Sequence, residues 1–165
     1  MYGIIATWRM ALEGISKADS MLKNNESAAN SIEEAIKAVE NFEYYKSVGY
    51  GGLPNEEMEV ELDAAFMDGD TLEFGCVGGV KDFANPVSIA RSLMHYDANN
   101  FLAGQGAEKY ASRHGFERKT MLTDRAKIHY HNRIKEITNT ELKPYSGHDT
   151  VGMVCLDTAG HMTCA

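Results

Sequence analysis

A β-hairpin in the first half of the chain limits most strongly how this sequence can fold. Two apolar runs, residues 60–66 and 72–80, flank Asp68-Gly69-Asp70. Asp-Gly between apolar runs is a strong signal for a tight antiparallel turn. Residues alternate along the first run, so one face of the hairpin is expected to pack in the core. Asp63 and Asp68 could be catalytic, but a solvated strand face and a turn explain them better.

Amphipathic helices are expected before and after this hairpin. Apolar residues at helical spacing predict helices over residues 10–22, 27–42, 86–95, 107–113 and 120–138. Further short strands are expected over residues 4–8, 101–103 and 151–156. Ser27, Asn85 and Thr123 lie at or near the starts of three of these helices and are predicted to cap them with a side-chain oxygen. At 165 residues the chain fits one domain or part of one.

Composition excludes several partners. The formal net charge is −8, which argues against nucleic acid because phosphate binding needs clustered Lys and Arg. No apolar run approaches the roughly 18 residues of a membrane span, so no membrane partner is expected. Cys76, Cys155 and Cys164 form no Cys-x-x-Cys pair and are expected to be free thiols in a reducing compartment. No signal peptide is visible, so we expect a cytoplasmic protein, or a periplasmic or secreted one if a signal peptide has been removed.

The richest glycine cluster follows the second predicted helix. It runs from Ser47 to Asn55 and holds three glycines within four residues. Such a cluster indicates positive φ angles or a close approach of the backbone to another group. A phosphate cradle would need a strand before the glycines and a helix after them, and here the order is reversed. We therefore exclude a nucleotide-binding loop.

The candidate catalytic feature is the change of character at Thr150. Gly147-His148-Asp149 leads to this threonine, and the apolar run 151–156 begins immediately after it. The pattern predicts a loop that enters a buried strand with one hydroxyl at the junction. If the bond before Thr150 is cut, its α-amine, with a pKa of about 7.7–8.0, can act as the base for its own hydroxyl. A β-branched residue after Asp is also ordinary at a strand start, so the segment alone permits both interpretations.

Five short motifs, none of them specific alone, occur in one order along the chain. They are Thr7-Trp8 after a strand, Ser47-Val48-Gly49-Tyr50-Gly51-Gly52-Leu53-Pro54, Leu62-Asp63-Ala64 with Met67-Asp68-Gly69, Asn85-Pro86-Val87-Ser88-Ile89-Ala90-Arg91, and His148-Asp149-Thr150-Val151-Gly152-Met153. Together they cover most of the chain. The set resembles the glycosylasparaginases, within the N-terminal-nucleophile hydrolases that include plant-type asparaginases.

The resemblance implies an α/β (α+β) fold, the four-layer αββα sandwich of those hydrolases. Only the α-chain part and the first β-chain strand would be present here. Residues 1–149 would form the α-chain region of a single domain, with a linker at about 139–149, and residues 150–165 would begin the β chain. The resemblance also implies that an inactive precursor is cut between Asp149 and Thr150.

The chemistry implied by the resemblance begins with autoproteolysis at His148, Asp149 and Thr150. Thr150 Oγ attacks the carbonyl carbon of Asp149, with the Asp149 carboxylate as candidate base and His148 orienting it. The mature Thr150 would then be the catalytic nucleophile on the side-chain amide of N4-(β-N-acetylglucosaminyl)-L-asparagine, a reaction of glycoprotein degradation. Trp8 resembles the family's substrate-binding tryptophan, and a core indole explains it equally well. No cofactor and no metal are implied.

The expected partners are a small-molecule glycosylated asparagine or asparagine, the remaining β-chain segment, and a second αβ unit in a homodimer. Two alternatives stay open. One is L-asparaginase or isoaspartyl peptidase activity on the same fold, and the other is a non-catalytic α/β module with a structural Thr150.

Two features depart from the family's pattern. Met10 stands where the family often has Phe, with Arg9 between it and Trp8, which affects the entrance to the site and the leaving-group preference. Only 16 residues, Thr150 to Ala165, follow the expected cut. The groups that hold the substrate's α-carboxylate and α-amine, and the oxyanion hole, would belong to a missing segment. We expect this chain to be an incomplete, inactive fragment, because an oxyanion-hole donor is worth ~10²–10³ in rate.

Overall fold

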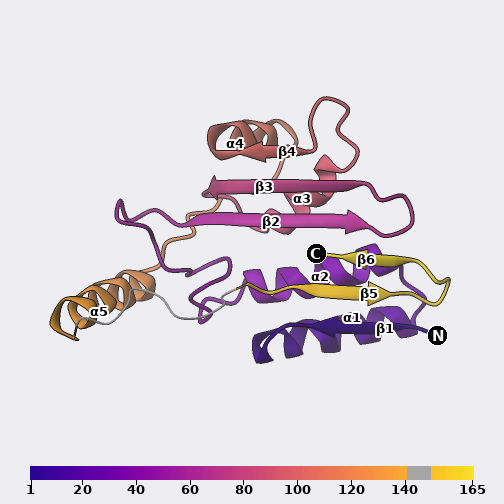
Figure 1. The fold of residues 1–165 in the computed structure, drawn as a ribbon, viewed down its shortest axis with the longest axis horizontal. Helices are drawn as coiled ribbons and strands as arrows, with labels where there is room; N and C mark the ends of the chain where they lie inside the picture. Colours follow the sequence, from indigo (N-terminus) through magenta and orange to yellow (C-terminus); the bar gives the residue numbers. More distant parts are fainter. Residues whose placement is uncertain (141–149) are drawn as a thin grey trace.

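The sheet of this protein is assembled from both ends of the chain. The computed structural model describes residues 1–140 and 150–165. Its six strands lie in the order β1-β5-β6-β2-β3-β4 (Figure 1). They are β1 (Gly3–Ala6), β2 (Glu61–Asp68), β3 (Phe74–Lys81), β4 (Phe101–Ala103), β5 (Met153–Leu156) and β6 (Met162–Cys164). Only the β3–β4 pair is parallel.

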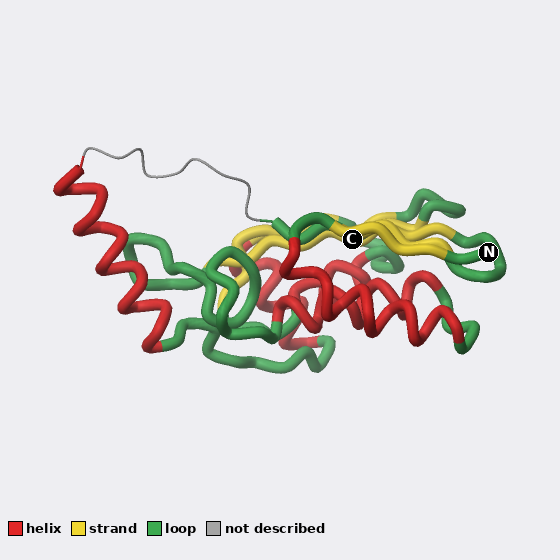
Figure 2. Tube along the Cα trace, turned by 90° about the horizontal axis from the view of Figure 1, so that it is seen from below, coloured by secondary structure: helices red, strands yellow, loops and turns green. Residues whose placement is uncertain are grey.

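Helices cover one face of this sheet. The helical elements of the described chain are the short 3-10 turn η1 (Arg9–Ala11) and the helices α1 (Leu12–Lys23), α2 (Ala28–Glu40), α3 (Pro86–Leu93), α4 (Gly104–Arg113) and α5 (Asp124–Thr140). Helices α1, α2 and α3 pack against the sheet on the same side, whereas α5 projects away from it (Figures 1 and 2). Gly14 permits the close packing of α1 on α2, since a Cβ there would lie 2.4 Å from the Ala35 carbonyl oxygen.

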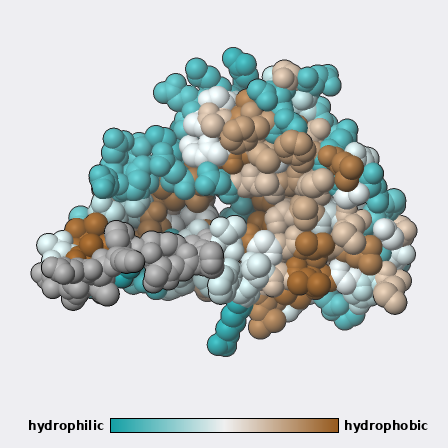
Figure 3. Space-filling view, viewed as in Figure 1, coloured by the Kyte–Doolittle hydropathy of each residue, from teal (hydrophilic) through white to brown (hydrophobic). Residues whose placement is uncertain are grey.

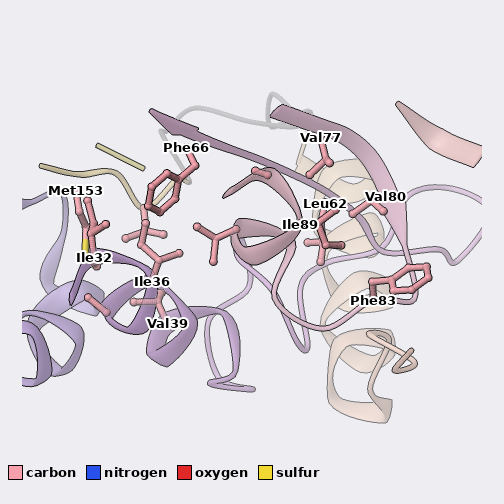
Figure 4. Packing of buried hydrophobic residues seen from close by; sticks show 14 of the residues in the cluster. Ile32, Ile36, Val39, Leu62, Phe66, Val77, Val80, Phe83, Ile89 and Met153 are labelled. Carbon is pink, nitrogen blue, oxygen red and sulfur yellow. The ribbon is translucent and has the colours of Figure 1, made fainter. Parts of the chain in front are cut away.

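The core lies between the helices and the sheet. Ile32, Ile36 and Val39 recur at helical spacing on α2 and are buried against Phe66 of β2 and Met153 of β5 (Figure 4). Each such side chain contributes about 1.5–3 kcal/mol on burial. The two ends of the chain are therefore held in one core by the same helix.

The opposite face of the sheet carries exposed apolar side chains. Ile5 lies opposite Val154, and Met67 lies opposite Phe74, so these residues share a face. Ile5 is 77% exposed and Phe101 is 54% exposed, and Figure 3 shows apolar residues gathered over the strands. An apolar area of this kind on a folded chain marks a surface that binds something.

These layers confirm the predicted α+β class. The described chain contains one sheet and one helical layer, which are two of the four layers expected for the family (Figure 2). The three cysteines are free thiols, as predicted. Among residues 1–140 and 150–165, no helix has the length and apolar character needed to cross a membrane.

The predicted hairpin is formed by β2 and β3. Asp68 serves the turn, because its Oδ1 accepts hydrogen bonds from the backbone N–H groups of Asp70 and Thr71, both at 2.9 Å. These hydrogen bonds lower the pKa of Asp68, and the bond from Thr71 has the larger effect. The ladder shifts register between Leu62 and Ala64, and Asp63 Oδ1 accepts from the Gly79 N–H at 2.8 Å across this bulge.

Two predicted helix starts differ from the structure by three residues or more. Helix α4 begins at Gly104 rather than at Ala107, so the Gly104-Gln105-Gly106 segment is helical although glycine disfavours a helix. Helix α5 begins at Asp124 rather than at Thr120. Thr123 caps it by accepting from the Ala126 N–H at 3.2 Å, and Ser27 caps α2 through the Asn30 N–H at 3.2 Å, both as predicted.

Candidate active site

Thr150 lies at the entrance of β5, on the wall of a large cavity. The cavity has a volume of about 770 Å³, and its wall includes Thr7, Ser47, Glu40, Asp63 and Thr150. Thr150 is exposed, whereas Val151, the next residue, is 8% exposed. The predicted entry into a buried strand is therefore present at Thr150, whose hydroxyl-bearing side chain lies beside a cavity. The polar approach, residues 147–149, lies outside the described residues.

The cavity lies where the sheet opens. Strand β6 pairs with β2 only at two positions, Met67 with Cys164 and Asp68 with Thr163. The rest of β2, from Glu61 to Phe66, lies along one side of the cavity, and residues 150–154 lie along the other. This leaves room for a small molecule or a further strand next to Thr150.

Thr7 fixes the main chain that follows Thr150. Its Oγ1 accepts a hydrogen bond from the Gly152 N–H at 2.8 Å and lies 3.2 Å from the carbonyl oxygen of Thr150. The Thr7 N–H donates to the Gly152 carbonyl at 2.9 Å. The pairing of β1 with β5 thus continues one step beyond the strands, up to the predicted nucleophile.

Trp8 follows Thr7 in an unusual backbone conformation. Its φ of 63° and ψ of 153° lie in a region that is almost restricted to glycine and costs about 1–3 kcal/mol for other residues. The indole is 54% exposed and is not among the side chains that line the cavity in the described part of the chain. Its predicted contact with substrate stays a prediction.

Glu40 brings an unexpected carboxylate to the cavity wall. It is the last residue of α2 and is 3% exposed. Its two carboxylate oxygens accept from the Val87 N–H and from Asn85 Nδ2, each at 3.1 Å. Burial raises the pKa of Glu40 to about 7, although both hydrogen bonds oppose the shift. A carboxyl group whose pKa is close to neutral pH and which lies in a cavity is typical of a functional site.

The predicted helix start at Asn85 and Pro86 is confirmed, but the predicted capping hydrogen bond from the Asn85 side chain is absent. Asn85 precedes α3 in a left-handed conformation, and its side chain makes no capping bond to the helix. Its amide donates to Glu40 instead, and Glu40 takes the first-turn N–H of Val87. A buried carboxylate without hydrogen-bond donors is costly in free energy. The Asn85 side chain therefore bonds Glu40 and does not cap α3.

The glycine cluster is explained by close backbone packing. Gly49 has a φ of 65°, and a Cβ there would lie 2.1 Å from the Glu40 carbonyl oxygen. The same carbonyl accepts from the Tyr50 N–H at 2.7 Å. This contact holds the segment of Ser47, Val48 and Gly49 against the cavity, where all three residues form part of the wall.

The sequence alone predicted a functional role for only some of the residues at this site. His148 and Asp149 lie outside the described residues, so their predicted roles stay predictions. Thr7 and Ser47 belong to two of the five motifs, but no functional role was predicted for either residue. No role was predicted for Glu40, which lies outside the motifs. The available signal for Glu40 was its position, four residues after Ile36 and eight after Ile32, which continues the buried stripe of α2. Within residues 1–140 and 150–165, no group of three or more His, Cys, Asp or Glu side chains could hold a metal ion.

Thr150 thus lies at the entry to β5, beside the cavity, and β5 pairs with β1, the first strand of the chain. The sequence profile of the family described as asparaginase matches residues 6–165, and this chain belongs to that family.

Relatives within the family are named for two activities. The chain is 30% identical over 162 residues to the N(4)-(β-N-acetylglucosaminyl)-L-asparaginase of Elizabethkingia miricola, covering 98% of this chain and 47% of the relative. It is 36% identical over 162 residues to the isoaspartyl peptidase/L-asparaginase of Mus musculus, covering 93% of this chain and 49% of the relative. The Rattus norvegicus protein of the same name is 35% identical over 160 residues, covering 93% and 48%. The chain spans about half the length of these relatives.

Proposed function

We propose that this chain belongs to an autoproteolytic amidohydrolase with an N-terminal threonine nucleophile, cut between Asp149 and Thr150. The observation that supports this most directly is the place of Thr150, exposed at the start of a buried strand and on the wall of the cavity. A nucleophile needs an accessible hydroxyl on a rigid support, and a strand end supplies one.

The precursor reaction would release the base that the mature enzyme uses. Thr150 Oγ attacks the carbonyl carbon of Asp149, the C–N bond breaks, and the threonine nitrogen receives the proton that the hydroxyl loses. The resulting ester is hydrolysed by water, which leaves a carboxylate on Asp149 and a free amine and hydroxyl on Thr150. The Asp149 carboxylate, oriented by His148, is the proposed base for the first step.

The proposed substrate is N4-(β-N-acetylglucosaminyl)-L-asparagine. Thr150 Oγ attacks its side-chain amide, the amino sugar leaves with a proton, and water releases aspartate from the β-aspartyl ester. Support comes from the His148-Asp149-Thr150 motif and from the Elizabethkingia relative. Trp8, which follows the cavity-wall residue Thr7 in the chain but does not itself line the cavity, is the proposed substrate contact.

A second candidate is L-asparaginase or isoaspartyl peptidase activity. The specific observation in its favour is the higher identity to the Mus musculus protein, 36% against 30%. Turnover of the glycosylated asparagine, of asparagine and of a β-aspartyl dipeptide by the full-length gene product separates the two candidates. The preferred substrate should exceed the others in kcat/KM.

The remaining β-chain segment is the proposed partner of the bare sheet face. A second sheet on Ile5, Phe74, Phe101 and Val154 would bury their exposed apolar surface and complete four layers. The span of about half the relatives' length is consistent with such a segment. Pairing of two αβ units into a homodimer and a cytoplasmic location rest on the sequence alone, and gel filtration and cell fractionation test them.

Mass spectrometry of the full-length gene product tests the central proposal. We expect two polypeptides, one of which begins at Thr150. A single uncut polypeptide after prolonged incubation, with no amidase turnover, would instead identify a non-catalytic α/β module.

A further inference from the structure

The hydroxyl of Thr7 bridges two main-chain groups on either side of Val151. It accepts from the Gly152 N–H at 2.8 Å and lies within hydrogen-bond distance of the Thr150 carbonyl oxygen, at 3.2 Å. Thr7 and Gly152 are 145 positions apart in the chain. The contact therefore joins the first strand of the protein to the start of the last hairpin.

The direction of the second hydrogen bond follows from counting protons. The Thr7 hydroxyl has one proton, and two carbonyl oxygens lie near it, Thr150 O at 3.2 Å and Gly152 O at 3.4 Å. The Gly152 oxygen already accepts from the Thr7 N–H at 2.9 Å. We therefore assign the Thr7 hydroxyl as donor to Thr150 O, which accepts no other hydrogen bond from the described part of the chain.

We infer that Thr7 is a positioning residue for Thr150, and this inference rests on the proposed nucleophilic role of Thr150. The bridge uses only the carbonyl group of Thr150. It involves neither the nitrogen nor Oγ of that residue, which are the atoms that the proposed chemistry needs. The fixed carbonyl and the buried Val151, which both follow the Thr150 Cα in the chain, restrict how that Cα can turn. Thr7 does not touch reacting atoms.

The backbone around Thr7 is consistent with this role. Trp8 adopts a conformation that non-glycine residues rarely hold, with φ 63° and ψ 153°. Such conformations persist where surrounding contacts over-determine them, and they concentrate at functional sites. The kink ends β1 at the point where Thr7 reaches residues 150–152, and it sends the chain into η1. Thr7 is thus held at the end of the hydrogen-bonded β1–β5 pair and not within it.

The alternative role for Thr7 is purely structural, as a residue that ends a strand pair. The variants Thr7→Val and Thr7→Ser separate the two roles. Valine keeps the shape and the β-branch but removes the hydroxyl, whereas serine keeps the hydroxyl and loses the methyl group. Thr158→Val is the matched control, because the Thr158 hydroxyl is exposed, bonds Asn25 at 3.1 Å and lies off the cavity wall.

The experiment measures two rates in the full-length gene product: the appearance of the new N-terminus at Thr150 by mass spectrometry, and kcat on the preferred amide substrate. In Thr7→Val we expect both rates to fall roughly tenfold, the rate equivalent of one hydrogen bond, with KM changed by less than about twofold. Thr7→Ser should restore both to within about threefold of wild type, and Thr158→Val should match wild type.

Three outcomes overturn the inference. The first is a Thr7→Val protein that cuts and turns over like the wild type. The second is an equal loss in Thr7→Val and Thr7→Ser, since the shape and not the hydroxyl would then matter. The third is a rise in KM alone, which would make Thr7 a substrate contact.

Three further results bear on the inference. Should Thr7→Val fail to fold, Thr7→Cys replaces it, because a thiol keeps the size but is a weak donor and acceptor, and equal rates in Thr7→Cys and Thr7→Ser overturn the inference. An uncut wild-type protein overturns the proposed function and this inference together. Normal cutting in both wild type and Thr7→Val overturns the inference alone.

Discussion

The carboxylate of Glu40 accepts a hydrogen bond from the backbone N–H of Val87, at 3.1 Å and 47 positions away in the chain. The end of α2 therefore supplies the acceptor for the first turn of α3. Because Gly49 packs against the Glu40 carbonyl, one residue joins α2, α3 and the glycine-rich segment at the cavity wall. The geometry of this part of the wall therefore depends on one buried residue, whose side chain bonds the start of α3 and whose main-chain carbonyl contacts Gly49.

The first prediction concerns the pH dependence of stability. Burial raises the pKa of Glu40 from the ordinary 4.5 to about 7, with Glu33 adding to the shift and Lys37 opposing it. Between these pH values the folded protein holds a proton that the unfolded chain has released. Stability from this group is therefore complete at low pH and declines as the pH rises towards 7, by up to about 3 kcal/mol.

The variant Glu40→Gln isolates this contribution, because the amide cannot ionise and keeps an oxygen for the Val87 N–H. Urea unfolding of both proteins at pH 5 and pH 7.5 gives the measurement. Wild type should lose stability relative to Glu40→Gln at the higher pH. Parallel behaviour of the two proteins across this range would refute the raised pKa.

The second prediction concerns Gly49→Ala. A Cβ at this position would lie 2.1 Å from the Glu40 carbonyl oxygen, on a backbone with φ of 65°, so the packing and the backbone conformation both oppose it. We expect a loss of at least about 2 kcal/mol in the free energy of unfolding. Gly106→Ala is the control, because a Cβ there meets nothing within 4 Å; this change within α4 should be neutral or stabilising. Equal effects would contradict the assigned packing.

The third prediction separates the nucleophile from its surroundings. In the full-length gene product, Thr150→Ala should leave one uncut polypeptide, because the attacking oxygen is gone. Thr150→Ser retains an oxygen and should be cut, more slowly than wild type. Mass spectrometry over a time course distinguishes the three proteins, and ordinary cutting of Thr150→Ala would exclude Thr150 as the attacking residue.

The fourth prediction concerns the bare face of the sheet. If a second sheet covers it in the full-length protein, Ile5→Lys buries a charge and should lower the free energy of unfolding by at least about 2 kcal/mol. The control is Ile128→Lys on α5, where the side chain is 61% exposed against 77% for Ile5. Thermal unfolding of the two variants should differ clearly. A full-length Ile5→Lys protein as stable as Ile128→Lys would show that the sheet face stays open.

Local patterns in the sequence were sufficient to predict most of the helices and strands, but they did not show the contacts between distant parts of the chain. The β2–β3 hairpin followed from Asp-Gly and alternation, and the caps at Ser27 and Thr123 followed from residue type next to an apolar stripe. Asn85 failed as a cap because its competitor, Glu40, lies 45 positions away and is seen only in the folded chain. Residue patterns report periodicity and propensity but not which buried group lacks a donor.

The candidate site shows the same division. The place of Thr150 at a strand entry follows from one abrupt change of polarity. Thr7 is an ordinary strand-end residue in the sequence, and its contact with residues 150–152 depends on the pairing of β1 with β5. That pairing is a long-range property of the sheet, which no local pattern encodes.

The strand order has a consequence for a protein cut before Thr150. Strands β5 and β6 lie between β1 on one side and β2 on the other, so the two polypeptides would be interleaved within one hydrogen-bonded sheet. Breaking the peptide bond would then release no piece. The two polypeptides should migrate as a single particle under native conditions and separate only in denaturant. The new N-terminal amine of Thr150 would then stay at the position where the cut produced it.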